Sequence, residues 1–559
     1  MSIPPDLAEL LGTVATPLPA LTDVVSPPTA LAVASVGGDT AYEGANQFDG
    51  LQLWGPSLRS ADAEIIPEKG MLDARVRDTL RNDAYVAGGA TLHKDNIVGA
   101  LFLLNAKPET RILWGRDDDI WEQEFQEEIE TKFLLWSESS NNWMDAQRTK
   151  GLTDFVRLAV GTHTAGGEVL ASAEWMPDDG RPFRTAVQMI DTDRLSNPMN
   201  SWFDNNIRGG VERDRRGAPI AYHIRGGHPS DYANAASYKW TRVMARKPWG
   251  RQMILHIYEQ MRPDQSRGIS AMVAALSEMK MTKGFRKVEL QRAVVASTYA
   301  ASIESDLPNA DVYRLMGGED DSENPAVRFM TEYLAAINEY TTAAKHVTVG
   351  DAKIPVYPPG TKLKLQNPGN AGPLGDKFEA SLLRYIAANL GLSYEQLSRD
   401  YTQTNYSSAR AAMGETWKHM LARKKIVADG TASFIYRLWL EEAINSGEIE
   451  SLKRRNVPNF YEGLNQEAYT ACEWIGAGQG QIDPLKETQA AVLKMKYGLS
   501  TKEVEIARLS GQDWRKVARQ IARERLVDEQ YGNATVGEAS GTGQDMENAL
   551  SGSPQEREG

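Results

Sequence analysis

The sequence predicts a mainly helical protein of the α+β class. Residues 71–175 carry the helical pattern most clearly, with apolar side chains at four-residue steps in Trp121, Phe125, Ile129 and Phe133. Residues 183–258 instead show short alternating runs, as in Ile220, Tyr222 and Ile224, which indicate β-strands. Two more helical stretches follow at 269–305 and 376–390. We therefore expect a β-rich module between groups of helices.

The two ends of the chain have compositions typical of segments that do not fold by themselves. Residues 1–45 mix Pro, Ala, Val and Thr with almost no charge and show no helical or strand period. Residues 531–559 are rich in Gly, Ser and Glu and hold few large apolar side chains. We expect a flexible arm at the first end and a disordered tail at the second.

The first long helical stretch is followed by an insertion of mixed character. Residues 269–305 contain no proline and predict a helix of unusual length, in which Gly284 is a potential break. Residues 307–375 contain a helical stretch at 326–340, a strand-like stretch at 362–366, and an acidic cluster formed by Glu319, Asp320, Asp321 and Glu323. We expect a small mixed insertion here.

The second long helix is delimited by local signals. Asp376 and Glu379 match a capping box, and Gly391 is a natural stop. Ser393 and Gln396 predict another capped turn, which leads into a polar loop. The next helix is expected to begin near residue 407 and has a basic face made by Arg423, Lys424 and Lys425. Final helices are predicted at 484–497 and 513–529, the latter opened by Asp513.

Bulk composition excludes several classes of protein. The 559 residues include 62 Lys plus Arg and 75 Asp plus Glu, and the net charge of -13 argues against a broad basic surface that coats nucleic acid. Cys472 is the single cysteine, so no internal disulfide forms and no structural zinc pattern exists. No apolar run approaches the ~20 residues of a membrane span. A protein of a reducing compartment without a membrane partner is expected.

No motif predicts catalysis, a bound metal or a cofactor. Asp191 and Asp193 form a DxD pair, which could hold a hard cation in a metal-dependent transferase or nuclease. We favour the structural interpretation, because Asp is common in loops that follow strands. The glycines at 476–480 lack the spacing and the following helix of a phosphate loop. Ser270 is outside any GxSxG elbow, and the histidines are scattered.

Four short segments together resemble the portal proteins of lambda-like tailed bacteriophages. They are MIDTDRL at 189–195, GGVERDRRGAPIAY at 209–222, RPDQSRG at 262–268 and WIG at 474–476. The longer stretches at 256–270 and 391–445 resemble the same family. The resemblance covers residues 75–530, whereas the arm and the tail show no family pattern.

The resemblance implies a portal fold with wing, stem, clip and crown regions, assembled as a ring of twelve copies around a central channel. Such a homododecamer would sit at one capsid vertex of the virion, after assembly in the host cytoplasm. Double-stranded DNA would be packaged and ejected through it. The implied partners are the terminase large subunit, the major capsid protein and scaffold, and head-completion and tail-connector proteins. No enzyme activity, cofactor or membrane is implied.

Mapped onto the segment order, the resemblance also divides the chain. The implied regions are a flexible arm at 1–45, the wing at 46–267, the first stem helix at 268–306, the clip at 307–374, the second stem helix at 375–399, the tunnel loop at 400–407, a wing return helix and linker at 408–480, the crown at 481–530 and a tail at 531–559. Another virion component, such as a head-tail adaptor or minor capsid protein, is the main alternative. It would share the helices and the acidic charge.

Two groups of residues are candidate functional surfaces under this mapping. A channel with dense basic walls would trap DNA, since each neutralised phosphate deepens binding through counterion release. Polar side chains are therefore expected to line the channel, and the tunnel loop supplies Thr402, Gln403, Thr404 and Asn405. The clip would present Glu319, Asp320, Asp321 and Glu323 to terminase or to connector proteins. Basic residues at 515–525 could face solvent, a neighbour or packaged DNA.

Overall fold

The computed structural model describes residues 55–177, 180–199, 201, 204–298, 335, 346–349, 352–355, 372–402, 404–453, 455–480 and 483–531. The chain divides into two units, Met1–Arg59 and Ser60–Gly559, and all elements below belong to the second unit. The predicted arm, the tail beyond Tyr531, Gln403 and the acidic cluster at Glu319, Asp320, Asp321 and Glu323 lie outside the described residues.

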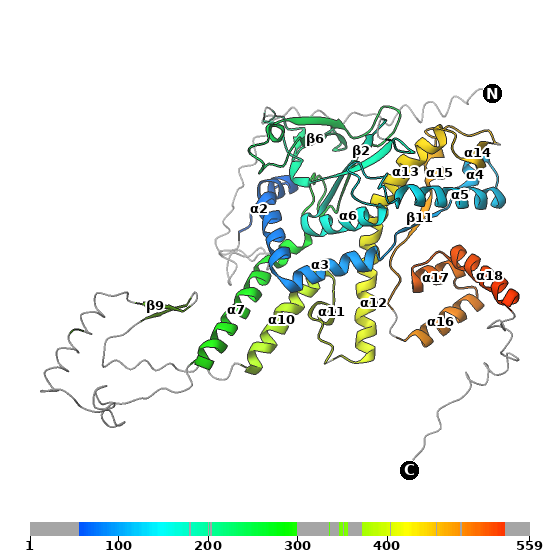
Figure 1. The fold of residues 1–559 in the computed structure, drawn as a ribbon. Coiled ribbons are helices and arrows are strands. Elements are labelled where there is room, and N and C mark those ends of the chain that lie inside the picture. Colours follow the sequence, from blue (N-terminus) through cyan, green and yellow to red (C-terminus); the bar gives the residue numbers. More distant parts are fainter. Residues whose placement is uncertain are drawn as a thin grey trace, which may run out of the picture. The chain divides into compact units, whose positions relative to one another are not determined.

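Helices form the first part of this unit (Figure 1). They are α2 (Ala61–Asn82), α3 (Ala84–Ile97), α4 (Thr110–Trp114), α5 (Asp119–Ser137) and α6 (Leu152–Gly166). The predicted stripe on α5 is confirmed, because Trp121, Phe125, Ile129 and Phe133 are all buried. Phe133 is central to an aromatic cluster, with its ring centroid 5.3 Å from that of Trp439 and 5.5 Å from that of Tyr436.

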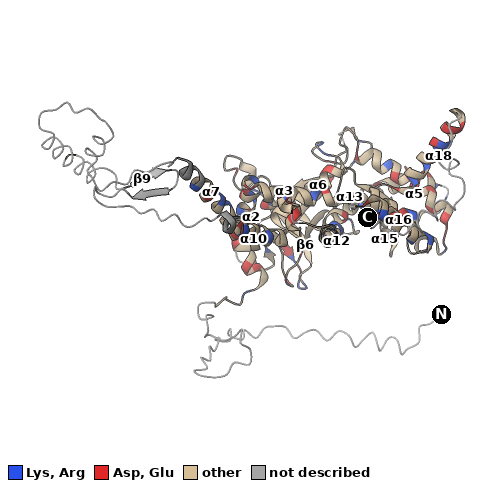
Figure 2. Cartoon of the chain, turned by 90° about the horizontal axis from the view of Figure 1, so that it is seen from below, with Lys and Arg blue, Asp and Glu red and all other residues tan. Residues whose placement is uncertain are grey.

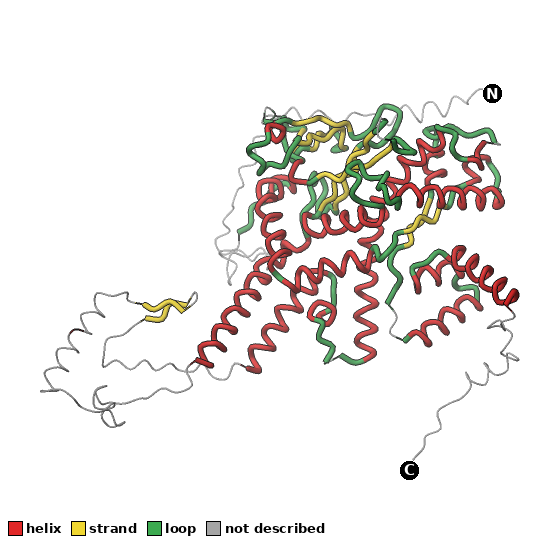
Figure 3. Tube along the Cα trace, viewed as in Figure 1, coloured by secondary structure: helices red, strands yellow, loops and turns green. Residues whose placement is uncertain are grey.

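Two antiparallel sheets follow, as the alternating pattern predicts (Figure 3). The first has the order β3-β2-β8, with β2 at Glu168–Trp175, β3 at Thr185–Ile190 and β8 at Ile254–Tyr258. The second has the order β4-β5-β6-β7, formed by Ile207–Arg208, Val211–Arg213, Pro219–Arg225 and Trp240–Met244. The helical prediction for 168–175 was wrong, because this apolar run is a central strand buried on both faces.

Helix α7 (Leu276–Thr298) begins later than the predicted start near Gly268. Ser270 is extended, and its hydroxyl accepts a hydrogen bond from Met272 N, which caps a 3-10 turn at Ala271–Ala275 ahead of the helix. Gly284 does not interrupt α7. A Cβ added at this glycine would meet no atom within 4 Å, so packing within the chain does not require a glycine here.

Helix α10 (Gly372–Leu390) begins four residues before the predicted capping box. That assignment to Asp376 and Glu379 was wrong, since Glu379 instead pairs with Arg286 of α7 at an Nε to Oε1 distance of 2.6 Å. The predicted stop is confirmed, because Gly391 has a φ of 66°. Between α7 and α10 the structure describes an antiparallel pair, β9 (His346–Val349) and β10 (Ala352–Pro355). The expected strand at 362–366 lies outside the described residues.

The remaining chain is again helical. It contains α11 (Tyr394–Ser398), α12 (Tyr406–Arg423), a π-helical turn at Lys424–Ala428, α13 (Asp429–Asn445), α14 (Glu450–Lys453), α15 (Asn465–Thr470), α16 (Pro484–Lys496), α17 (Lys502–Ser510) and α18 (Trp514–Tyr531). Strand β11 (Cys472–Ile475) returns to pair with β1 (Leu103–Ala106). Asp513 caps α18 as predicted, since its carboxylate accepts a hydrogen bond from Arg515 N. None of the described helices is long and apolar enough to cross a membrane.

Candidate functional site

The predicted tunnel loop is held at both ends. Ser393 and Gln396 form the predicted capping box at the start of α11. The Gln396 side-chain oxygen also accepts a hydrogen bond from Thr416 Oγ1 of α12, at 2.9 Å. Arg399 then ends α11 with a φ of 61°. The Gln396–Thr416 bond joins α11 to the middle of α12, so it links the two helices that flank the loop.

Local hydrogen bonds shape the loop itself. Asp400 Oδ1 accepts bonds from Thr402 N at 3.0 Å and from Thr402 Oγ1 at 2.7 Å, and these bonds lower the pKa of Asp400. Asn405 Oδ1 accepts a bond from Ser408 N at 2.9 Å and caps α12. Helix α12 therefore starts at Tyr406, and the predicted loop boundary at 407 was two residues too long.

The described candidate residues of this loop lie at the surface. Thr402 and Asn405 are exposed, and Thr404 is partly exposed. Thr402 and Asn405 also stabilise the turn and the helix start, so part of their hydrogen-bonding capacity is used locally. With Asp400 ionised, the loop side chains offer polar and negative groups, and the exposed Arg399 before them adds one positive charge. Such a surface can border DNA without holding its phosphates.

The predicted basic face at the end of α12 turns largely inward. Lys424 Nζ lies 2.7 Å from Asp429 Oδ1 and 2.7 Å from Trp474 O, and it lies over the ring of Phe102. Arg423 contacts His163 and Glu259. These two cations stabilise the fold around the π-helical turn, so of the three residues Lys425 alone is exposed.

Helices α7 and α10 lie side by side, as Figure 1 shows. Phe285 and Phe378 meet edge to face with centroids 5.3 Å apart, and Asn389 Nδ2 donates to Ala271 O at 2.9 Å. Their outward surfaces carry large apolar side chains. Met281 and Val288 of α7 are 56% and 61% exposed and are seven residues apart. This spacing places both on one side of the helix.

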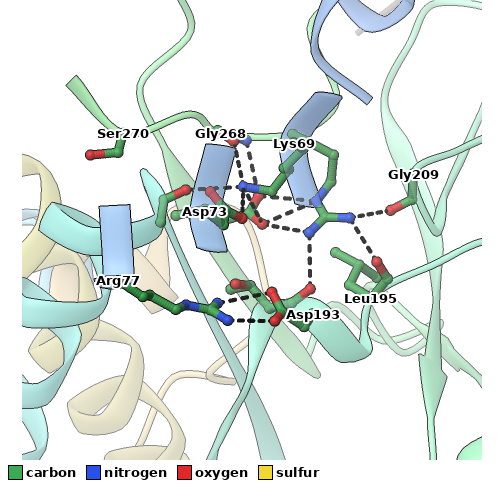
Figure 4. A network of polar contacts seen from close by, with 12 residues as sticks. Lys69, Asp73, Arg77, Asp193, Leu195, Gly209, Gly268 and Ser270 are labelled. Carbon is green, nitrogen blue, oxygen red and sulfur yellow. Dashed lines mark hydrogen bonds and ion pairs between the residues drawn. The ribbon is translucent and has the colours of Figure 1, made fainter. Parts of the chain in front are cut away.

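A buried network of charges joins α2 to the start of β2 and to the segment that precedes α7 (Figure 4). Its centre is Glu168 at the start of β2, which is fully buried. Arg267 Nε lies 3.1 Å from each carboxylate oxygen of Glu168, and Lys69 Nζ lies 3.3 Å from Oε1. His256 Nε2 lies 3.1 Å from Oε2, and Gly268 N donates to the same oxygen at 2.9 Å. Glu168 is thus surrounded by donors.

Arg267 and Lys69 also hold the backbone of several loops. Arg267 donates to the carbonyl oxygens of Thr192, Leu195 and Gly209 at 2.7–2.9 Å. Lys69 donates to Gly268 O at 2.8 Å, besides its ion pair with Asp73. The segments 189–195, 209–222 and 262–268, which carry the family resemblance, therefore meet at the Arg267 side chain.

Burial and pairing act in opposite directions on the ionisation of this network. Burial raises the pKa of Glu168, but Arg267, His256 and Lys69 outweigh it and hold that pKa well below its usual value. Burial lowers the pKa of His256 and raises the pKa of Asp73. At neutral pH the structure therefore favours an ionised Glu168 beside a neutral His256.

The DxD pair is part of an ion-pair cluster beside this network. Arg77 Nη2 donates to Asp193 Oδ1 at 2.9 Å and lies 3.7 Å from Asp191 Oδ1. Asp191, Asp193 and His228 each place a possible ligand atom within 4.8 Å of the others. The Arg77 guanidinium already supplies the positive charge that these carboxylates need. The geometry thus favours the structural interpretation of the DxD pair over a cation site.

Comparison with known proteins gives a family assignment. A family model described as "Phage portal protein, lambda family" matches residues 49–424. The chain belongs to this family. It is 36% identical to "Portal protein" of Escherichia phage N15 over 489 residues, which cover 87% of this chain and 89% of that protein. It is 35% identical to "Portal protein B" of Escherichia phage lambda over 486 residues, again 87% and 89% of the two chains.

Solved structures give a much weaker likeness. A chain of "Neck of native GTA particle computed with C12 symmetry" aligns with a TM-score of 0.35 and 13% identity, over 82% of this chain and 95% of that one. The family assignment depends on the family model and on the two phage relatives.

The sequence signals located the loop of this portal chain but missed its buried network. The loop residues are polar neighbours, and their capping partners lie three residues away. Glu168 and the contact of Lys69 with Gly268 gave no such signal, because the residues that these contacts join are 99 and 199 positions apart in the chain. Lys69 and Asp73, four residues apart on α2, are the one local pattern that could have indicated it.

Proposed function

We propose that twelve copies of this portal chain form a ring at one capsid vertex, and that double-stranded DNA is packaged and ejected through its central channel. Membership of the lambda portal family across residues 49–424 carries this proposal. The exposed apolar residues Met281 and Val288 support it, because apolar side chains at seven-residue spacing are suited to contact with a neighbouring helix. The ring places this side of α7 against an adjacent copy.

The loop 400–405 forms part of the channel wall in this proposal. Thr402, Gln403, Thr404 and Asn405 are the candidate lining residues, and the first, third and fourth are not buried. Their polar groups and the ionised Asp400 offer DNA few positive contacts, so the passing duplex releases few counterions and is not retained. The net charge of -13 fits the same requirement.

The remaining partners follow from the same assignment. The terminase large subunit and later connector proteins bind the clip through Glu319, Asp320, Asp321 and Glu323. The major capsid protein, the scaffold and head-completion proteins contact other parts of the ring. The ring acts as a virion conduit without catalysis of its own, and the packaging motor supplies the energy.

Electron microscopy of the purified full chain tests the proposal. Class averages of negatively stained particles should show rotational symmetry around a central opening, and they allow the subunits to be counted. Particles without an opening, or a chain that stays monomeric under capsid-assembly conditions, would contradict it. A particle with a pore but a different subunit number would correct the stoichiometry alone.

A further inference from the structure

The terminal helical unit, formed by α16, α17 and α18, has almost no core of its own. Among residues 483–531, all of which the structure describes, Ala491 is the one buried hydrophobic residue. Large apolar side chains lie instead at the surface and are 51–79% exposed: Leu485, Leu493, Tyr497, Leu499, Leu526 and Tyr531. Helix α18 contributes no buried residue at all.

The contacts of this unit with α5 and β1 are polar. Arg515 Nη1 lies 3.7 Å from Glu130 Oε1, and Arg519 pairs with Glu127. Glu503 accepts a hydrogen bond from Asn105 Nδ2 at 2.6 Å. The Arg519–Glu127 pair is exposed, so it stabilises by about 0–1 kcal/mol and is screened by salt, whereas the contacts of Glu130 and Asn105 are partly buried. They orient the unit without supplying the apolar burial that it lacks.

The energetic consequence follows from chain entropy. Fixing the backbone costs roughly 1–2 kcal/mol for each residue, and this cost is normally offset by the burial of apolar side chains. Because Ala491 is the one buried hydrophobic residue of the terminal helical unit, burial within this unit cannot offset the entropy cost of ordering it. Ordered α16, α17 and α18 therefore require another surface that covers Leu493, Tyr497 and their exposed neighbours.

We propose that this surface belongs to a second copy of the chain, so that the terminal helical unit completes its fold between neighbouring subunits. Charge complementarity favours this partner. Figure 2 shows residues of both charges along α18. Beyond the residues that pair with α5, this helix carries Arg523 and Arg525 among the acidic Glu524, Asp528 and Glu529, and α5 exposes Glu124 beside Glu127. A neighbour's α5 can thus repeat the pairing that α18 makes with its own α5. DNA offers phosphates to these cations but no cover for leucine and tyrosine.

This inference rests on the proposed ring and goes beyond it, because it makes folding of the terminal unit depend on assembly. Hydrogen exchange of the full chain, compared between monomer and ring fractions, tests it. The amides of α16, α17 and α18 should exchange at least about 100-fold more slowly in the ring. The amides of α13, whose Phe434, Ile435 and Trp439 are buried within one chain, should be protected in both fractions.

A pair of variants separates the possible outcomes. Leu493→Asp with Tyr497→Asp should leave rings intact but remove the protection of the terminal unit, whereas Thr488→Asp, at an exposed polar position of α16, should not. Rings in which the amides of α16, α17 and α18 exchange as fast as in the monomer would overturn this inference but would leave the proposed function in place. Equal protection in the monomer, or protection that appears solely when DNA is added, would also overturn it. Absence of rings would contradict the proposed function, and the inference with it.

Discussion

Arg267 shows how a single side chain can position distant parts of the chain. Its guanidinium pairs with Glu168 and holds three loop carbonyls, while the adjacent Gly268 backbone is bound by Lys69. Ser270, two residues further on, donates to Thr164 O at 2.7 Å and caps the turn that leads into α7. The direction in which α7 leaves the sheets is therefore set by buried polar contacts.

Arg267→Met should destabilise the chain strongly, because it leaves the Glu168 carboxylate buried without its main partner. A loss of about 3–5 kcal/mol in unfolding free energy is expected for such a change. Thermal unfolding of the monomer measures it. Arg242→Met is the matched control, since the Arg242–Glu212 pair lies at the surface and its loss should cost about 0–1 kcal/mol. Equal effects of the two changes would contradict the role assigned to Arg267.

The buried side chains of His93 and His163 are expected to make the free energy of unfolding depend on pH. Burial is the main reason that the pKa of each lies at about 4, and nearby Arg423 acts in the same direction. In the unfolded chain both imidazoles titrate at the ordinary histidine pKa of about 6.5. Their contribution to the free energy of unfolding is therefore complete above pH 6.5 and is lost as pH falls toward 4. At pH 5 each should contribute about 2 kcal/mol less than at pH 7.

Unfolding temperatures at pH 7 and pH 5 test this expectation. His163→Gln should reduce the drop between the two pH values, because Gln does not titrate. His93→Gln should reduce the drop in the same way, because burial also lowers the pKa of His93 to about 4. A drop of unchanged size in His163→Gln would show that other groups cause the acid sensitivity.

At the scale of elements, the sequence predicted structure well where the signals were local. Ser393 with Gln396, Gly391 and Asp513 all mark element ends as expected, because each acts on backbone groups within three residues. The signal at Asp376 misled, since Glu379 finds its partner in Arg286 on another helix. Strand β2 was missed for a related reason: its apolar run becomes a strand through pairing with β3 and β8.

The exposed side of α7 gives a prediction at this scale. Met281→Glu with Val288→Glu should leave the monomer's stability within about 0.5 kcal/mol, since both side chains are mostly exposed. The same change should abolish ring formation, because it places charges in a contact between copies. Lys283→Glu is a matched control on the opposite side of α7, with the same change in charge, and it should assemble. Sedimentation profiles that match the parent chain for the double variant would contradict the assigned interface.

At the scale of the whole molecule, the chain combines one well-packed body with surfaces that remain uncovered. The main core joins α5, α6 and α13 through large buried side chains such as Trp121, Phe155 and Trp439. The outward sides of α7, α10 and the terminal helical unit lack comparable cover. Such surfaces are expected of a subunit whose function depends on assembly with its own copies. The family resemblance of the sequence predicted assembly with further copies. Composition and periodicity could not predict it, because they do not reveal which apolar side chains remain exposed.

We propose that copies of this chain enclose a channel lined by the loop between α11 and α12. A cryo-electron microscopy reconstruction of the assembled full chain tests it most directly, because it locates Thr402, Thr404 and Asn405 relative to the symmetry axis. We predict that this loop, repeated in every subunit, borders the central channel. A reconstruction in which the loop lies on the outer rim, or in which no channel runs through the particle, would contradict it.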